Sequence, residues 1–264
     1  MSAGDGAIAP GRRAAISWSG GKDACLAGLL AREQGWSVER FVTMCEPDGL
    51  SKSHALPPAL LAAQVAALGG QWQPVNVPPG RYAACFDAVL AQLRAEGFEA
   101  MVFGDIDLQA HRDWLAPACA RAGLQAVFPL WGWARAQVAR AVIDRGIRAR
   151  LVCVDTQRLD GAFCGAAYDA ALLARLPAGV CPAGEDGEFH TVVLDAPGFA
   201  APLRVLEGRQ HETASAPPLR HTTLRWLPLV LAGRGASDTL CRPSRAGRRG
   251  LQGRPTHASD EGQT

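Results

Sequence analysis

The chain has 264 residues, 48% of them hydrophobic, which suits one or two domains with a buried core. Its 27 basic and 25 acidic residues leave a formal net charge of +2, which argues against a dedicated nucleic-acid surface. No apolar run reaches the roughly 18 residues that a membrane span requires, and residues 1–13 lack the apolar core of a secretory signal, so we expect a cytosolic protein with a flexible leader.

Apolar runs alternate with helical patterns along the first part of the chain. The apolar runs predict strands at 14–18, 38–45, 71–75, 100–103, 125–128 and 148–154. The segments between them predict helices at 23–34, 57–68, 81–96, 108–122 and 133–145. A glycine follows each helical pattern, as expected of a helix C-cap: Gly35, Gly69, Gly97, Gly123 and Gly146. We therefore predict an α/β domain over residues 14–157, built on a doubly wound parallel sheet.

The regular alternation of apolar runs and helical patterns ends after about residue 157. A helix near 166–176 and strand-like pieces to about 231 predict a smaller C-terminal subdomain over 158–232, on the substrate side of the sheet edge. Its segments 204–209 and 219–231 could pack on the sheet or mediate self-association, so a homo-oligomer stays open. Residues 233–264 are rich in Gly, Ser, Pro and Arg, with six Arg against three acidic residues. We expect a disordered basic tail there, with a weak RNA contact as the alternative.

The eight cysteines are scattered and include no C-x-x-C pair. Several lie within apolar patterns, such as Cys153 in Leu151–Val154. Buried thiols in a reducing compartment explain them better than a zinc cluster or a disulfide framework.

The most informative motif is a glycine loop that follows the first predicted strand and opens the first predicted helix. Glycines let an anion approach the backbone closely, and a helix N-terminus offers unpaired N–H groups and a positive dipole end. Lys22 is one of only two lysines in the chain, and its compact ammonium suits a phosphate cradle. The loop has neither the Walker A spacing nor the G-x-G-x-x-G spacing. We predict phosphate binding by Ser19, Gly20, Gly21, Lys22 and Asp23; the alternative is an ordinary glycine turn.

Two further polar segments are candidates for the same site. Residues 184–191 combine two glycines, three carboxylates and a histidine, which could bind Mg²⁺, hold an amine or act as a general base. The alternative is a polar hairpin loop without a chemical role. Gly104-Asp105-Ile106-Asp107 ends a predicted strand, where an acidic pair suits a metal or ribose hydroxyls; either aspartate could instead cap the next helix.

In a doubly wound sheet, the loops at the carboxyl ends of the strands lie at one edge. We therefore expect the glycine loop, residues 45–54, residues 104–107 and residues 155–160 to lie close together. His54 falls within the second of these loops, and a lone loop histidine is more often inert than functional.

The glycine loop resembles the Ser-Gly-Gly-Lys-Asp-Ser loop of the PP-loop (N-type) ATP pyrophosphatases, which cut ATP at the α-phosphorus to AMP and pyrophosphate. Over residues 14–200 the chain resembles the ATP-binding family that includes diphthine–ammonia ligase. Beside the loop, the matching segments are Thr43-Met44, His54, Gly104-Asp105-Ile106, Phe128-Pro129-Leu130-Trp131, Leu159-Asp160 and Gly184–Thr191. The chain departs from the family at three positions: Ala24 replaces a serine, Asp186 an asparagine and Ala166 an arginine.

This resemblance implies a PP-loop adenine-nucleotide hydrolase fold, with ATP and Mg²⁺ as cofactors. In the implied mechanism an acceptor carboxylate is adenylated and ammonia then displaces AMP, leaving an amide. Glu185 and Glu188 would hold ammonium or remove its proton, and His190 would position the reactants. Thr43, Met44 and Gly104 would join the glycine loop in binding nucleotide, and Asp23 and Asp105 would place the metal.

The family's best-known acceptor is diphthine, a modified histidine of the archaeal and eukaryotic elongation factor 2. An Ala-, Arg- and Gly-rich chain with two lysines suggests a GC-rich, bacterial genome, so the acceptor carboxylate, on a protein or a small molecule, stays open. Two other functions also stay open: a non-catalytic ATP-binding sensor, favoured by Ala24 and Ala166, and an ATP-dependent RNA-modifying enzyme, disfavoured by the near-neutral charge.

Overall fold

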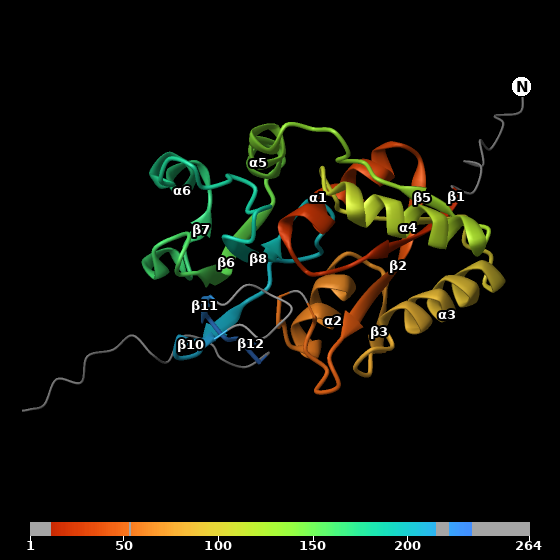
Figure 1. Cartoon of the computed structure of the whole chain (residues 1–264), viewed down its shortest axis with the longest axis horizontal. Helices are drawn as coiled ribbons and strands as arrows, with labels where there is room; N and C mark the ends of the chain where they lie inside the picture. The colour runs from red at the N-terminus through yellow and green to blue at the C-terminus, as the bar shows by residue number, and fades with distance from the viewer. Residues whose placement is uncertain (1–11, 53, 215–221, 234–264) are drawn as a thin grey trace, which may run out of the picture. The chain divides into compact units, whose positions relative to one another are not determined.

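The computed structural model describes residues 12–52, 54–214 and 222–233. Figure 1 shows the order of its elements along the chain. The first part contains β1 (Arg12–Ser17), α1 (Lys22–Glu33), β2 (Trp36–Cys45), α2 (Pro58–Ala67), β3 (Gln71–Asn76), α3 (Tyr82–Ala95), β4 (Ala100–Val102), α4 (Gln109–Arg121), β5 (Gln125–Val127), α5 (Arg135–Asp144) and β6 (Arg148–Asp155). The remainder contains a short 3₁₀ turn (Gly161–Phe163), β7 (Ala167–Tyr168), α6 (Ala170–Arg175), β8 (Phe189–Asp195), β9 (Val205–Glu207), β10 (His211–Ala214), β11 (Thr223–Trp226) and β12 (Leu229–Leu231).

A parallel five-stranded sheet forms the centre of the first part, in the order β3-β2-β1-β4-β5. The chain runs outward from β1 to β3 and then returns to the other side of β1 as β4. This reversal between β1 and β4 is the switch point at which α/β sheets bind ligands, beyond the carboxyl ends of the strands. The glycine loop follows β1 and the Gly104–Asp107 loop follows β4, so both lie at this point. The predicted α/β class and doubly wound sheet are confirmed.

Side chains alternate along β1 between two hydrophobic cores, because successive residues of a strand point to opposite faces. Ala14 and Ile16 belong to a core that includes residues of α1, α2 and α5, whereas Ala15 belongs to one that includes residues of α3 and α4. Helices therefore cover both faces of the sheet. The predicted C-cap glycines are also confirmed, since positive φ angles of 70° to 88° occur at Gly35, Gly69, Gly97, Gly123 and Gly146.

One expected strand does not join the parallel sheet. β6, predicted as its continuation, lies instead in an antiparallel sheet with the order β10-β11-β6-β7, and β8 also pairs with β6. Residues of β6 such as Leu151 and Val154 are buried, and an apolar run is equally compatible with a central antiparallel strand. The Asp155–Asp160 loop therefore approaches the site from the second sheet, where Asp155 N donates to Glu188 O at 2.9 Å.

The helix expected near 166–176 is shorter, because its first residues form β7, and Asp169 caps α6 by accepting a hydrogen bond from Leu172 N at 2.8 Å. The described residues of 158–232 belong to one compact unit with the parallel sheet. The expected leader, apart from Arg12 and Arg13, and the expected tail, apart from Gly233, lie outside the described residues.

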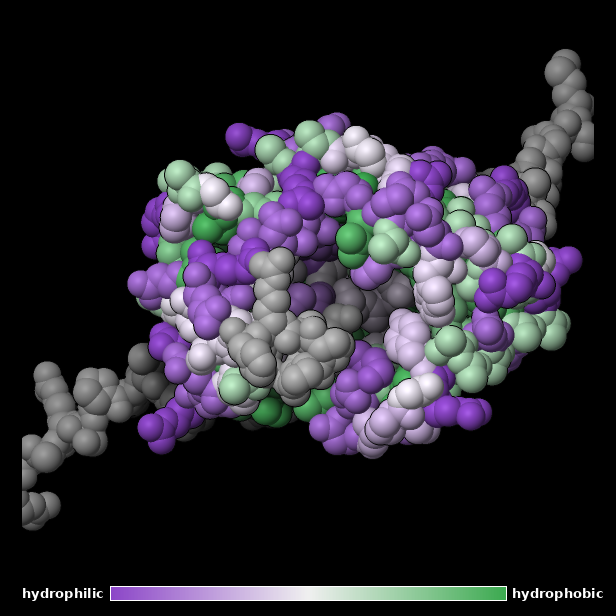
Figure 2. All heavy atoms as spheres, viewed as in Figure 1, coloured by the Kyte–Doolittle hydropathy of each residue, from purple (hydrophilic) through white to green (hydrophobic). Residues whose placement is uncertain are grey.

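None of the described helices is long and apolar enough to cross a membrane. On the face drawn in Figure 2, hydrophobic residues are dispersed among hydrophilic ones.

Candidate active site

The glycine loop between β1 and α1 needs both of its glycines. Gly20 has a φ of +80°, which strongly favours glycine, and a Cβ at this position would lie 2.7 Å from Leu56 Cδ1. Gly21 has an ordinary φ of −91°, yet its Cβ would lie only 2.4 Å from His54 Cε1. One glycine is therefore required by conformation and packing, and the other by packing alone.

Strand β8 fixes the loop from the other half of the chain. Thr191 Oγ1 accepts a hydrogen bond from Lys22 N at 3.1 Å, and Val193 N donates to Gly20 O at 2.9 Å. The buried side chain of Gln64 donates to both Gly20 O (3.0 Å) and Val193 O (2.7 Å). The glycine loop and residues 184–191, predicted separately from the sequence, are thus in direct contact.

Lys22 is buried in this arrangement, with only 3% of the residue exposed. Its ammonium donates to Asp23 Oδ2 at 2.7 Å and to Ala183 O at 2.5 Å. The ring centroids of Tyr168 and Phe189 lie 5.5 and 5.7 Å from Nζ. The ammonium is therefore directed at the start of the 184–191 loop, and two of its three N–H donors are engaged by protein oxygens.

The start of α1 leaves groups available for an anion and a cation. Gly21 N is directed to Ser19 Oγ at 3.3 Å and Lys22 N to Thr191, whereas the N–H groups of Asp23 and Ala24 have no acceptor among the described residues. Asp23 Oδ1 is buried and also has no partner there. An orphaned carboxylate oxygen beside free N–H groups fits a divalent cation bound together with a phosphate.

Within the described part of the chain, no three acidic, histidine or cysteine side chains cluster as a complete metal site. Mg²⁺ commonly uses only one or two carboxylates and takes its other ligands from water and phosphate, so Asp23 is compatible with it.

The loop after β4 packs directly on this helix end. A Cβ on Gly104 would lie 2.9 Å from Ala24 N, so only glycine allows the approach. Asp105 Oδ1 lies 2.8 Å from His111 Nδ1, and Asp107 contacts Arg135. Neither aspartate caps α4, whose N-cap residue is Leu108 and has no side-chain cap, so the capping alternative is wrong.

Glu185 lies among the charges of the site. Burial, and next the nearby Asp23 carboxylate, raise the pKa of its carboxyl to about 7. The charges of Lys22 and Arg135 act in the opposite direction, whereas Asp107 adds to the increase. A carboxyl group that titrates near neutral pH can both take up and release a proton, as acid–base catalysis requires.

Glu188 occupies a different environment. It is 2% exposed, and its two oxygens accept hydrogen bonds from Cys181 N at 2.8 Å and Asp186 N at 3.1 Å. Both oxygens are thus engaged with the backbone on either side of Glu185. This geometry favours a role in holding the loop over the acid–base role expected from the sequence.

Arg135, at the start of α5, links the two acidic loops and was not identified from the sequence. It donates to Asp107 Oδ2 at 2.7 Å and Oδ1 at 3.1 Å, and its Nη1 lies 2.9 Å from Asp186 Oδ1. These bonds raise the pKa of the guanidinium above its usual value. The additional charge at Asp186, where the family has asparagine, is therefore matched by a cation. No local motif marks Arg135, since its partners are brought to it only by folding.

Two histidines pack together beside the glycine loop. The ring centroids of His54 and His190 are 4.8 Å apart. Burial, and next the charge of Lys22, lower the pKa of His190 to about 4. Burial also lowers the pKa of His54 well below its usual value, with smaller contributions from His190 and Lys22. Both rings are neutral at pH 7. His54, which matches a loop histidine of the family but was expected to be inert as a lone loop histidine, thus contacts the loop at Gly21.

The predicted nucleotide-binding pair, Thr43 and Met44, lies near the end of β2. Thr43 is buried, and its hydroxyl donates to Trp18 O at 2.8 Å and accepts from Trp72 Nε1 at 3.0 Å. Met44 packs against the core formed with α3 and α4. In this structure Thr43 therefore supports the end of β1, from which the glycine loop begins.

Family models match both halves of this arrangement. The diphthamide synthase N-terminal domain matches residues 12–126, and the diphthamide synthase C-terminal domain matches residues 135–216. The chain belongs to the diphthamide synthase family. The two matches include the glycine loop in the first domain and the 184–191 loop in the second. Membership of this family indicates an ATP-using enzyme of the PP-loop class.

A comparison with curated proteins gave no match. Among solved structures, the chain is similar to the U34-tRNA thiolase NcsA from Methanococcus maripaludis, described with its [4Fe-4S] cluster. The sequence identity is 12% and the TM-score 0.33, over 53% of this chain and 60% of the thiolase chain. The match thus spans less than two thirds of the thiolase.

Proposed function

We propose that this chain is an AMP-forming ligase that joins ammonia to a carboxylate. The acceptor carboxylate attacks the α-phosphorus of ATP, forming an acyl-adenylate and releasing pyrophosphate. Ammonia then attacks the acyl carbon, AMP leaves, and the amide forms with loss of one proton. The observation that carries this proposal is the contact between the glycine loop and the 184–191 loop, which brings Lys22 and Asp23 close enough to influence the pKa of Glu185.

In the first step, the proposal assigns the phosphates of ATP to the start of α1. The free N–H groups of Asp23 and Ala24 would bind the departing pyrophosphate, because donors that are already oriented stabilise developing charge without reorganisation. Lys22 would exchange Ala183 O for a phosphate oxygen. Bound Mg²⁺ would neutralise phosphate charge, with Asp23 Oδ1 as its protein ligand and Asp105 as a second candidate.

In the second step, Glu185 would hold ammonium and take the proton lost as the amide forms. Its pKa of about 7 suits this exchange at neutral pH. Glu188 would position Glu185 through the backbone bonds on both sides, and His190 would exclude water beside the loop as a neutral ring.

The test is product analysis of ATP incubated with the full chain, Mg²⁺, ammonium and a cell extract as the source of acceptor. We expect AMP and pyrophosphate from the wild type and almost none from Lys22→Met. Lys52→Met is the matched control, because among the described residues the ammonium of this other lysine pairs with Glu46 alone. Circular dichroism of both variants would establish that they fold.

Each other outcome has a defined meaning. ADP and phosphate as products would refute the PP-loop assignment. Tight ATP binding without turnover, in the presence of extract and ammonium, would favour the sensor. A dependence of AMP release on RNA in the extract would favour RNA modification. If Glu185→Gln formed as much amide as the wild type, the role of Glu185 would be wrong even though the ligase assignment stood.

A further inference from the structure

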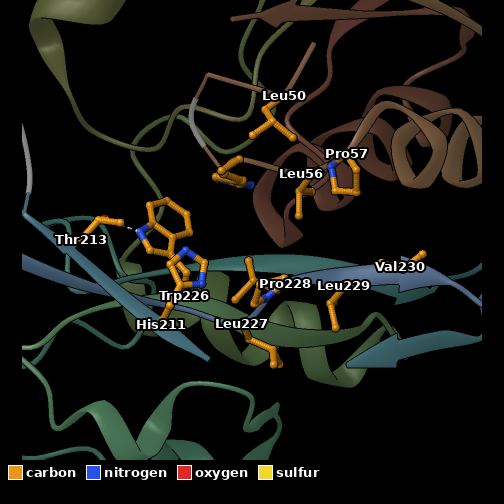
Figure 3. Close-up of a pocket in the computed structure, with 13 residues that line it drawn as sticks. Leu50, Leu56, Pro57, His211, Thr213, Trp226, Leu227, Pro228, Leu229 and Val230 are labelled. Carbon is orange, nitrogen blue, oxygen red and sulfur yellow. Dashed lines mark hydrogen bonds between the residues drawn. The ribbon is translucent and has the colours of Figure 1, made fainter. Parts of the chain in front are cut away.

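A pocket of about 530 Å³ lies beside the glycine loop, outside the contacts described above. Figure 3 shows that Leu50, Leu56 and Pro57, from the segment between β2 and α2, face Trp226 and Pro228 across it. The pocket is thus formed between the first part of the chain and strands β10, β11 and β12. Its volume falls in the range of small-molecule sites, roughly 300 to 1,000 Å³.

The described residues that line the pocket are uncharged: none of them is a lysine, arginine, aspartate or glutamate. Its polar atoms come from two histidines, Thr213 and Trp226, and the last two are hydrogen-bonded to each other at 2.9 Å. The triphosphate of a nucleotide would have no cation here, whereas a flat, uncharged group would pack against the indole and the two prolines.

His54 connects this pocket to the proposed reaction site. It lines the pocket and also packs on Gly21, where the position of a glycine Cβ lies 2.4 Å from its Cε1. His54 Nδ1 is buried and has no hydrogen-bond partner among the described residues. His54 thus separates the pocket from the phosphate-binding loop, with Nδ1 on the loop side, 3.1 Å from the Cβ position of Gly21, and a ligand that packs on the ring from the pocket would act on a side chain that touches the loop.

We propose that this pocket binds the uncharged, flat body of the acceptor, and that the acceptor is a small aromatic or heteroaromatic carboxylic acid whose carboxylate extends past His54 to the glycine loop. This inference rests on the proposed function for the role of the carboxylate. The binding of the ring itself depends only on the pocket.

The test uses indole-3-acetate, 1-naphthoate and imidazole-4-acetate as probes, with acetate as the ringless comparison. Calorimetric titration of the full chain, in the presence of Mg²⁺ and a non-hydrolysable ATP analogue, measures their affinities. We expect at least one ring-bearing acid to bind at least tenfold more tightly than acetate. Trp226→Ala and Val230→Trp should each weaken the binding of that acid at least tenfold.

Val230→Trp fills the pocket at a residue that is 61% exposed, so it tests the site without opening the core. Trp114→Ala is the matched control, because this tryptophan lies on α4, is 39% exposed and does not line the pocket. The Trp114→Ala variant should bind the ring-bearing probe as tightly as the wild type does.

Three results would overturn the inference: no ring-bearing probe binds at millimolar concentration, the pocket variants bind as well as the wild type, or the ATP analogue itself displaces the probe. Release of AMP is measured separately on the same proteins. Probe binding without AMP formation would leave the pocket established and refute the ligase. AMP formation that is unchanged in both pocket variants would leave the ligase standing and refute the acceptor site.

Discussion

Replacing Gln64 by leucine tests whether a single buried amide holds the glycine loop against β8. Gln64 is fully buried and makes three hydrogen bonds: it donates to Gly20 O and Val193 O and accepts from Trp18 Nε1 at 3.1 Å. Leucine fills a similar volume but supplies none of them. Gly20 O retains Val193 N as a donor, whereas no other described hydrogen bond serves Trp18 Nε1.

An unsatisfied buried donor costs about 1–3 kcal/mol, and each further lost hydrogen bond costs about 1 kcal/mol. After allowing for the gain from an apolar side chain, we expect the free energy of unfolding to fall by about 2–4 kcal/mol. Urea denaturation followed by circular dichroism measures this loss, and the midpoint should fall while the slope stays constant.

Gln137→Leu is the matched control, because Gln137 is exposed on α5 and its side chain makes no hydrogen bond with the described residues. A change within about 0.5 kcal/mol is expected there. If Gln64→Leu were as mild as this control, the amide would not hold the loop and the reasoning would be refuted.

Three further predictions concern the site. The pKa of Glu185 in the folded protein, about 7, lies above its ordinary value of 4.5. Its contribution to stability is therefore complete below pH 4.5 and is lost as the pH rises through 7. Urea titrations across this range should show a decrease in the free energy of unfolding of the wild type that Glu185→Gln lacks. Arg135→Met should move the pH midpoint of AMP formation upward, because Arg135 lowers the pKa of Glu185. The control Arg121→Met, which breaks an exposed pair with Asp87, should leave the midpoint unchanged. Equal midpoints in the wild type and both variants would contradict the acid–base role of Glu185. Gly21→Ala should cost about 1–3 kcal/mol of unfolding free energy through its clash with His54, and a double-mutant cycle with His54→Ala should recover much of this loss; strict additivity would exclude the contact.

The departures from the family pattern differ in their structural consequences. Asp186 is paired with Arg135, so its charge is accommodated within the site. Ala24 is buried at 5% exposure in the core beneath the loop, and its free N–H is retained without the serine hydroxyl. Ala166 takes part in backbone pairing, accepting a hydrogen bond from Leu151 N at 3.0 Å. Nothing in the structure explains why arginine is absent at that position.

Local sequence accounts for the elements of the parallel sheet and for the glycine loop. Strand β1, helix α1 and the glycine that ends the helix depend on side-chain periodicity and backbone freedom, which act between near neighbours in the chain. The predicted phosphate loop, residues 104–107 and residues 184–191 were all found in this way. The same reasoning assigned β6 to the wrong sheet, because an apolar run does not specify its partner strand.

The sequence by itself determined which segments carry polar chemistry, since lysine and carboxylates next to glycines are rarely buried without partners and are typical of sites. Only the tertiary structure decided what each side chain does there. Glu185 and Glu188 are three residues apart and chemically alike, yet one is left with a pKa near neutral and the other is bonded to the backbone on both sides. Gln64 and Arg135 carry no local signal, because their importance comes from partners far away in the chain. Burial and charge at the site are sums over such distant neighbours, and folding alone brings these together.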